Sequence, residues 1–190
     1  MGYPADHKEK TRQKIVKAAR RLWKGNGFSG ASVDKVMNEA GLTRGGFYAH
    51  FKSKDDLLVE VLSENKLLEG LEMLKAKGMD APDMQRKAAL EWYLSTQHRD
   101  HPQDGCPLTA LTQEIPRLGK RSRRVMSNMI QKFAVWLRGD KQEASGLAAL
   151  SLMVGAVTLS RAVEDEKLAD EILVEAKEHL CHMLEDVEYK

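Results

Sequence analysis

The stretch that most constrains the fold of this chain is residues 32–54, SVDKVMNEAGLTRGGFYAHFKSK. Ser32 is a favourable helix N-cap, and the apolar residues that follow it recur at the spacing of one helix face. Gly41 can adopt the positive φ that ends a helix, and Thr43 can cap a second helix over residues 44–50. Two short helices joined by a turn of three or four residues have the spacing of a helix-turn-helix, whose second helix can enter the major groove of DNA.

An ordinary helical hairpin is the alternative, because Gly-Leu-Thr alone does not exclude it. The surrounding residues favour the helix-turn-helix. Residues 11–58, with Gly27, Phe28 and the block GFYAHFKSK over 46–54, closely resemble the amino-terminal domain of TetR-family transcriptional repressors. This resemblance covers about a third of the chain, and beyond residue 60 only the helical layout is similar.

The resemblance implies an all-α fold of about nine helices in two domains. Residues 1–54 would form a three-helix helix-turn-helix head, and residues 55–190 a helical body for ligand binding and dimerisation. Such a protein would bind a palindromic double-stranded DNA operator as a homodimer, and a small-molecule effector would release it.

The charge distribution agrees with a polyanionic partner at one end of the chain. Residues 1–54 hold 12 Lys and Arg against 4 Asp and Glu, a net charge of +8, whereas the remainder carries a net charge of −6. Basic helix faces are often merely solvated, but this asymmetry beside a helix-turn-helix favours nucleic acid. No apolar run is long enough to cross a bilayer and the polar start is no signal peptide, so we expect a cytoplasmic protein without a membrane partner.

Apolar spacing predicts the remaining helices and the breaks between them. Gly and Pro residues place a break at 78–83, and composition predicts a loop over 98–107. The predicted helices are residues 8–25, 53–77, 81–97 and 108–115, one that begins within 117–124 and continues to 139, and residues 143–163 and 167–188.

Arg44 is the expected base reader of the predicted DNA site. It stands at the helix turn that would enter the groove, and arginine can bind guanine O6 and N7 with two hydrogen bonds. The resemblance implies that most other members position the protein on phosphates or line the groove, and the two glycines let the backbone come close. Phe47 and Phe51 are expected in the core of the head. The predicted site comprises Ser32, Thr43, Arg44, Gly45, Gly46, Tyr48, His50 and Lys54.

Methionine and aromatic residues of the body are candidates for an effector pocket. Methionine adapts its shape and aromatic rings offer broad contact area, which suits an apolar ligand. The alternative is that these residues form plain helical core. The candidates are Met73, Trp92, Cys106, Met126, Met129, Phe133, Trp136 and Met153.

The last two predicted helices carry small and apolar residues that suit a four-helix dimer interface with a twofold mate. The alternative is that they only close the core of the monomer. The predicted interface comprises Ala148, Ser151, Gly155, Leu159, Ile172, Ala176, Leu180 and Met183.

Cys106 carries the second hypothesis for the signal that releases DNA. It precedes Pro107, so its thiol would lie where a helix begins, and the positive end of the helix dipole favours the reactive thiolate. Some TetR-like regulators with Gly-Cys in this region respond to electrophiles or oxidants. A merely buried cysteine is the alternative.

Other chemistry finds little support in the sequence. Two cysteines fit a reducing compartment without a disulfide framework. The histidines near Cys106 match no metal-ligand spacing, so neither a metal nor a cofactor is predicted. A phosphate loop, a nucleophile elbow and a metalloprotease helix are all missing from the sequence, which argues against an enzyme. An effector-independent DNA-binding protein is a third reading, although it would not need so large an acidic body.

Overall fold

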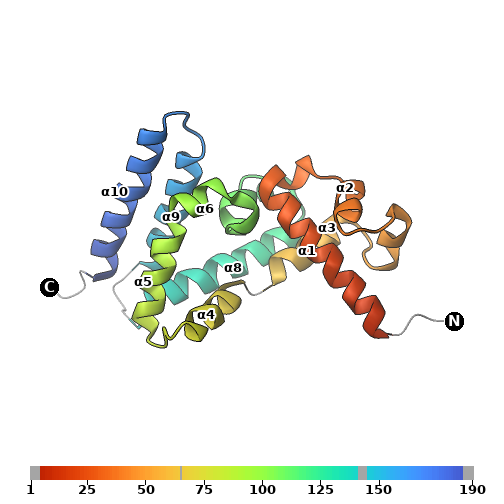
Figure 1. Ribbon diagram of the computed structural model, residues 1–190, viewed down its shortest axis with the longest axis horizontal. Coiled ribbons are helices and arrows are strands. Elements are labelled where there is room, and N and C mark those ends of the chain that lie inside the picture. The colour runs from red at the N-terminus through yellow and green to blue at the C-terminus, as the bar shows by residue number, and fades with distance from the viewer. Residues whose placement is uncertain (1–4, 65, 141–144, 186–190) are drawn as a thin grey trace. The chain divides into compact units, whose positions relative to one another are not determined.

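The computed structural model describes residues 5–64, 66–140 and 145–185 (Figure 1). Every regular element within these ranges is a helix, as the sequence predicts: ten α-helices and three short 3-10 helices. The helices group into two compact units. Unit 1 contains Met1–Glu64 and Pro102–Met126, and unit 2 contains Asn65–His101 and Ser127–Lys190. These units describe how the chain packs and do not show which residues bind DNA or a ligand. The functional boundary expected between residues 54 and 55 therefore stays a prediction.

Unit 1 holds the predicted helix-turn-helix and a later part of the chain. Its core is built on large side chains that are fully buried, among them Trp23, Met37 and Phe47. Burying such a side chain contributes about 1.5–3 kcal/mol each. The elements of unit 1 are α1 (Ala5–Gly30), α2 (Val33–Glu39), η1 (Arg44–Ala49), α3 (Lys54–Ser63), η2 (Pro102–Asp104), α7 (Pro107–Leu111), η3 (Ile115–Arg117) and the start of α8 (Lys120–Arg138).

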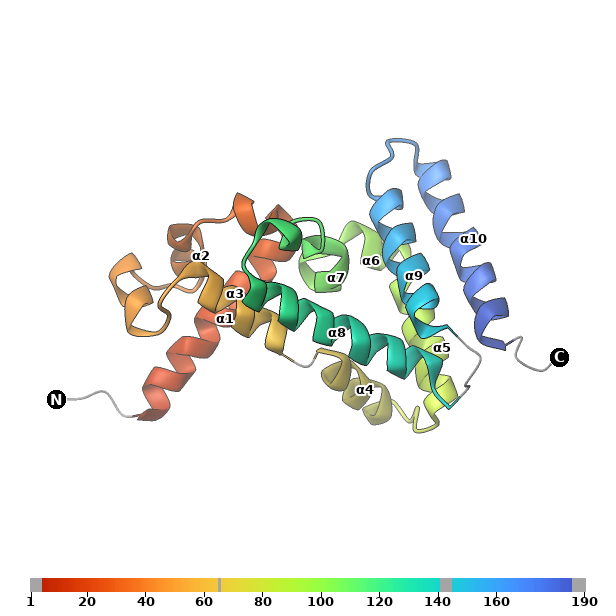
Figure 2. The same cartoon turned by 180° about the vertical axis from the view of Figure 1, so that it is seen from behind.

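Unit 2 is built around α9 and α10, which run side by side (Figures 1 and 2). The buried residues of α10 are Ala169, Leu173, Ala176 and Leu180, and their spacing of four, three and four residues forms one helix face. The elements of unit 2 are α4 (Lys66–Ala76), α5 (Pro82–Tyr93), α6 (Thr96–Asp100), the remainder of α8, α9 (Gly146–Ser160) and α10 (Glu166–Glu185).

Several predicted helix limits were wrong, and capping residues explain two of the differences. The helix predicted over 81–97 ends at Tyr93, because Ser95 begins α6 by accepting a hydrogen bond from the His98 N–H at 3.2 Å. The predicted loop over 98–107 therefore contains the end of α6 and all of η2. The helix predicted over 53–77 is interrupted at Glu64, whose backbone is extended.

Other limits differ at the ends of helices. The first helix continues to Gly30, with a break at Gly27, where φ is +75°. The predicted start at 143 and the predicted end at 188 lie outside the described residues. Across the part of the chain that the structure describes, no helix is both long and apolar enough to cross a bilayer.

Candidate nucleic-acid interface

The turn of the predicted helix-turn-helix forms as the capping residues indicate. Ser32 caps α2, and its Oγ accepts a hydrogen bond from the Lys35 N–H at 3.3 Å. Gly41 ends α2 with a φ of +69°, a conformation that glycine adopts without steric cost. The Leu42 N–H then donates to the Met37 carbonyl at 2.9 Å, which closes the turn. Ser32 is therefore confirmed as a cap, a role that fixes the start of α2.

The second helix of the motif is a 3-10 helix, η1, rather than the α-helix expected over 44–50. Thr43 occupies its N-cap position without a capping hydrogen bond from its side chain. Phe47 faces inward and is fully buried, with Tyr48 packed edge-on against it at 5.3 Å between ring centroids. The tight 3-10 turn thus anchors η1 through Phe47 and leaves its other side open.

The outward surface of η1 carries the residues that could read DNA. Arg44 and Tyr48 have 69% and 65% of their side chains exposed, and Thr43 and Gly45 are exposed as well. A Cβ added at Gly45 would meet no atom within 4 Å, so the fold of unit 1 does not require glycine there. The same surface therefore exposes the Arg44 guanidinium, the Tyr48 phenol and the backbone at Gly45 to solvent.

Arg44 is held from one side before any partner binds. Its Nη1 lies 3.0 Å from Oδ2 of Asp34 in the first turn of α2. Exposed ion pairs of this kind contribute at most about 1 kcal/mol, so DNA can displace Asp34 at small cost. The pair orients the arginine across the turn and leaves its guanidinium accessible.

His50 follows η1 and is half-buried behind the exposed residues. Burial and the nearby charges of Lys8 and Arg12 lower its pKa, so the imidazole is neutral at pH 7. The His50 carbonyl accepts a hydrogen bond from Arg12, whose guanidinium also pairs with Glu60 and lies over the Phe51 ring. His50 therefore lies at a junction where α1 and α3 support the end of η1.

Lys54 is placed differently from the other predicted DNA residues. Its ammonium donates to the Phe28 carbonyl and lies 4.1 Å from the centroid of the Phe28 ring. Burial lowers its pKa, and the charges of Glu114 and Asp55 partly offset that effect. This position gives Lys54 a packing role, and its predicted phosphate contact stays a prediction. The neighbouring Lys52 is exposed.

Sequence reasoning missed Glu114, which supports the last residues of α1 after the break at Gly27. Its carboxylate accepts hydrogen bonds from the Phe28 N–H at 2.6 Å and from the Ser29 N–H and hydroxyl at 2.9 and 2.6 Å. Burial opposes ionisation of Glu114, but these hydrogen bonds and the Lys54 charge outweigh it and lower the pKa. A Cβ at Gly27 would lie 2.7 Å from a Glu114 oxygen, so glycine makes room for this carboxylate.

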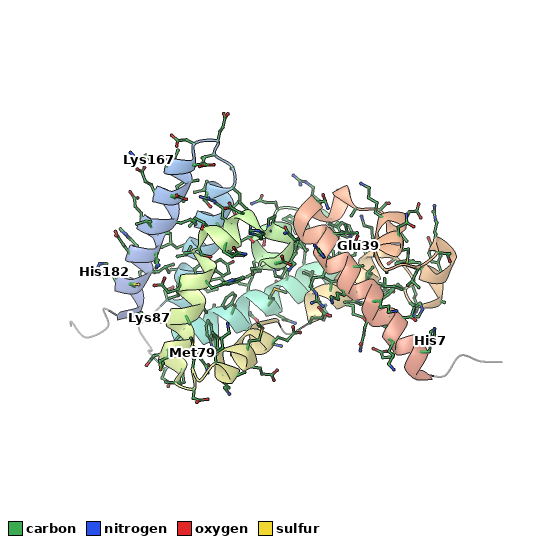
Figure 3. All side chains as sticks on the ribbon, in the orientation of Figure 1. His7, Glu39, Met79, Lys87, Lys167 and His182 are labelled. Atoms are coloured by element: carbon green, nitrogen blue, oxygen red, sulfur yellow. The ribbon has the colours of Figure 1, made fainter. Side chains whose placement is uncertain are left out.

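The first half of α1 adds positive charge to the same unit. A hollow of about 340 Å³ runs along it, lined by His7, Lys10, Thr11, Gln13, Lys14 and Lys17. Figure 3 labels His7 near the start of α1. Unit 1 as a whole carries 17 Lys and Arg against 10 Asp and Glu, a net charge of +7. Its electrostatic field therefore favours a polyanion.

Comparisons with known proteins show what the head of this chain is similar to. The model of the bacterial regulatory proteins, tetR family, matches residues 15–61, which contain α2 and η1. The HTH-type transcriptional regulator AcrR of Shigella flexneri is 43% identical over 61 residues, 31% of this chain. Residues 15–61 of this chain are therefore similar to the helix-turn-helix head of TetR-family regulators. The matched stretch spans only 28% of AcrR.

Solved structures extend the likeness to the whole fold of TetR-family proteins. NemR of E. coli, in its reduced form, has a TM-score of 0.68 at 18% identity, covering 90% of this chain and 95% of NemR. SCO4454, a TetR-family transcriptional regulator from Streptomyces coelicolor, has a TM-score of 0.65 at 23% identity. The match covers 95% of this chain and 97% of SCO4454. These structures show a shared all-α fold, and the family match covers the helix-turn-helix segment of the head.

The body of this chain brings some of the predicted effector residues together. Trp92 and Phe133 each contact Tyr93, with ring centroids 6.4 and 6.1 Å apart, and Phe133 contacts Trp136 at 5.7 Å. His98 is buried and stacks on Trp92 at 4.6 Å. Tyr93 and His98 were not among the predicted residues, although both lie within six residues of Trp92 in the chain.

The remaining predicted effector residues are scattered. Met73 is 64% exposed on α4, whereas Met153 is fully buried in α9. Met126 and Cys106 belong to unit 1, apart from the aromatic residues of unit 2. Met129 is half-buried on α8. Of the predicted residues, the described ring contacts join Trp92, Phe133 and Trp136, with Tyr93 between Trp92 and Phe133. Together with Tyr93 and His98 they form the aromatic group of unit 2.

The predicted dimer residues fall on two different faces. Ala148, Ser151 and Leu159 are exposed on the outer side of α9, and Gly155 lies on the same side with open space beyond its Cα. Ile172 and Met183 lie on a half-buried face of α10 that also holds exposed Leu168. Ala176 and Leu180 are buried on the face that packs within unit 2, and their predicted place in the dimer interface stays a prediction. Figure 3 labels Lys167 and His182 toward the two ends of α10.

Cys106 lies at the start of α7, as the proline beside it predicts. Its side chain is half-buried, and the adjacent Gly105 carbonyl accepts a hydrogen bond from Lys24 at 2.9 Å. Within the described ranges, no group of three or more His, Cys, Asp or Glu side chains is placed to hold a metal ion.

Proposed function

We propose that this chain is a repressor that binds an inverted-repeat DNA operator as a homodimer. The observation that carries the proposal is the exposed surface of η1, where Arg44 and Tyr48 project above the buried Phe47. Arg44 would contact a guanine edge in the major groove, and the positive charge of unit 1 would supply the attraction to phosphate.

The homodimer would form through the outer faces of α9 and α10. Three exposed leucines there, Leu147, Leu159 and Leu168, are 57%, 60% and 45% exposed in the protomer. Small residues between them, including Gly155, allow two helices to approach closely. A dimer brings two heads to DNA, and this is the arrangement that an inverted repeat requires.

The effector would be a small apolar molecule recognised by the aromatic group of unit 2. Trp92 is 46% exposed while the rings behind it are packed together, so a planar or aliphatic ligand could extend the stack. Binding would favour a conformation in which the two heads no longer match the spacing of the half-sites.

The test is a gel-shift assay with DNA from upstream of the chain's own gene. We expect a retarded complex that a compound from an apolar library releases, at a concentration that also raises the thermal midpoint of the protein. Binding that no compound relieves would indicate an effector-independent DNA-binding protein. Failure to bind any duplex at low salt would contradict the proposal.

A second candidate signal is oxidation or alkylation of Cys106. Its favouring observations are the half-buried thiol at the start of α7 and the fold shared with NemR, whose structure is that of a reduced form. Cys106→Ser would then bind operator normally but keep it after treatment with a quinone or a mild oxidant. Release by the variant as by the parent would assign Cys106 a structural role, and that is the result we expect.

A further inference from the structure

A basic segment far from the helix-turn-helix in sequence belongs to the same compact unit. Residues 117–124 contain five cationic side chains, and the sequence has no Asp or Glu from 115 to 139. Sequence position assigns this segment to the acidic body, but packing places it in unit 1 with the head. We define the 117–124 patch as Arg117, Lys120, Arg121, Arg123 and Arg124.

The 117–124 patch faces solvent. All five side chains are exposed, whereas Ser122 and Met126 on the opposite side of α8 are buried, with 1% and 3% of their surface exposed. The helix face with Ser122 and Met126 packs against the rest of unit 1. Packing does not explain why the opposite face carries cationic side chains. Four of the five charges also stand in the first five residues of α8, where the helix dipole disfavours cations. Arg121 pairs with Asp56 and Arg123 donates to the Pro116 carbonyl, but these two contacts do not account for the whole cluster, which points to a use outside the protomer.

The patch adjoins the part of the head that follows the recognition segment. Arg121 pairs with Asp56, which lies in the first turn of α3. In both views the start of α8 lies beside α3 (Figures 1 and 2). The patch thus lies next to the first turn of α3, which holds Asp55 and Asp56, and it adds cationic side chains to unit 1 at a place other than η1.

We propose that the 117–124 patch binds the sugar-phosphate backbone of duplex DNA that flanks each operator half-site. This inference rests on the proposed DNA binding and adds to it a second contact surface outside the helix-turn-helix. Lysine and arginine side chains on phosphates position a protein on DNA and carry no base information. The patch would therefore add affinity and salt dependence to operator binding and leave its sequence preference unchanged.

The test compares two duplexes that carry the same operator, selected from a random duplex pool with the parent protein. One duplex ends at the inverted repeat, and the other extends by about one helical turn on each side. The test variant is Lys120→Ala/Arg124→Ala, which leaves Arg121 and its ion pair intact. The control is Lys132→Ala/Arg138→Ala, which removes two exposed cations from the same helix within unit 2. Unchanged thermal midpoints would show that both variants fold.

We expect the parent to bind the extended duplex more tightly than the trimmed one, and the test variant to lose this advantage by roughly ten-fold at moderate salt. The slope of log affinity against log salt should become shallower by about 0.9 for each phosphate that the variant no longer neutralises. The control variant should behave like the parent. Equal losses on both duplexes, or no loss on either, would overturn the inference while leaving operator binding intact. A parent protein that binds neither duplex would overturn the proposed function and this inference with it.

Discussion

At the scale of single residues, the head depends on charges that serve packing as well as DNA. Lys54 and Glu114 approach the same short segment after Gly27 from two sides, one binding its carbonyl and the other its N–H groups. Ser32 and Gly41 could be predicted from sequence, because capping is a local property. Glu114 could not, because its partners lie 85 and 86 residues earlier in the chain.

Glu114→Gln should destabilise the protein by about 1–2 kcal/mol at pH 7, since charge-assisted hydrogen bonds to Phe28 and Ser29 are weakened. The folded-state pKa of Glu114 lies below its ordinary value of 4.5, so its contribution is present above pH 4.5 and is lost as the pH falls through the folded value. Thermal unfolding of both proteins across this range measures the effect. A difference that persists unchanged at low pH would show that the carboxylate charge is not the cause.

At the scale of elements, two glycines of α9 differ in what surrounds them. A Cβ at Gly146 would lie 1.9 Å from the Ala134 carbonyl oxygen, so glycine allows α9 to approach α8. A Cβ at Gly155 would meet nothing within 4 Å. The small-residue pattern predicted close helix approach correctly at Gly146, but it could not tell approach within the protomer from approach by a partner.

Gly155→Arg should convert dimers to monomers in sedimentation analysis while leaving the thermal unfolding of the protomer nearly unchanged. Gly146→Ala is the matched contrast: it should retain self-association but lose about 1–3 kcal/mol of stability, because the backbone it meets must shift. A Gly155→Arg protein that remains fully dimeric would place the interface on another surface.

The predicted dimer residues of α10 also show that helical spacing alone does not tell which apolar residues pack within the protomer. Ala176 and Leu180 are apolar, as are Ile172 and Met183, and both pairs recur at helix spacing. Only the first pair faces the interior of unit 2. The spacing of apolar residues predicts that α10 is amphipathic. Packing against α9 determines which of its apolar residues are buried.

At the scale of the whole molecule, the chain separates a cationic unit of net charge +7 from a unit of net charge −5. The sequence predicted this polarity from its first 54 residues, and the family and the all-α fold followed from the same stretch. It could not predict that residues 102–126 pack with the head, because that grouping depends on contacts between segments distant in the chain.

A dimer with this charge distribution should bind inverted half-sites whose centres are about 34–36 Å apart, one helical turn of DNA. Affinity should fall steeply as salt rises, because phosphate contacts release counterions. Insertion of five base pairs between the half-sites would rotate one of them to the opposite side of the duplex and should abolish tight binding. Equal affinity for the spaced and parent operators would contradict binding as a symmetric dimer.

The most direct test of the central claim, that η1 reads DNA through Arg44, is selection of operator sequences from a random duplex pool. The parent protein should yield an inverted repeat, and Arg44→Ala should lose the preference at one position in each half-site, a discrimination worth about 1–3 kcal/mol. Lys52→Ala is the matched control, since it removes an exposed cation nearby and should weaken all sequences alike. An Arg44→Ala protein that selects the same repeat with the same preferences would contradict the account.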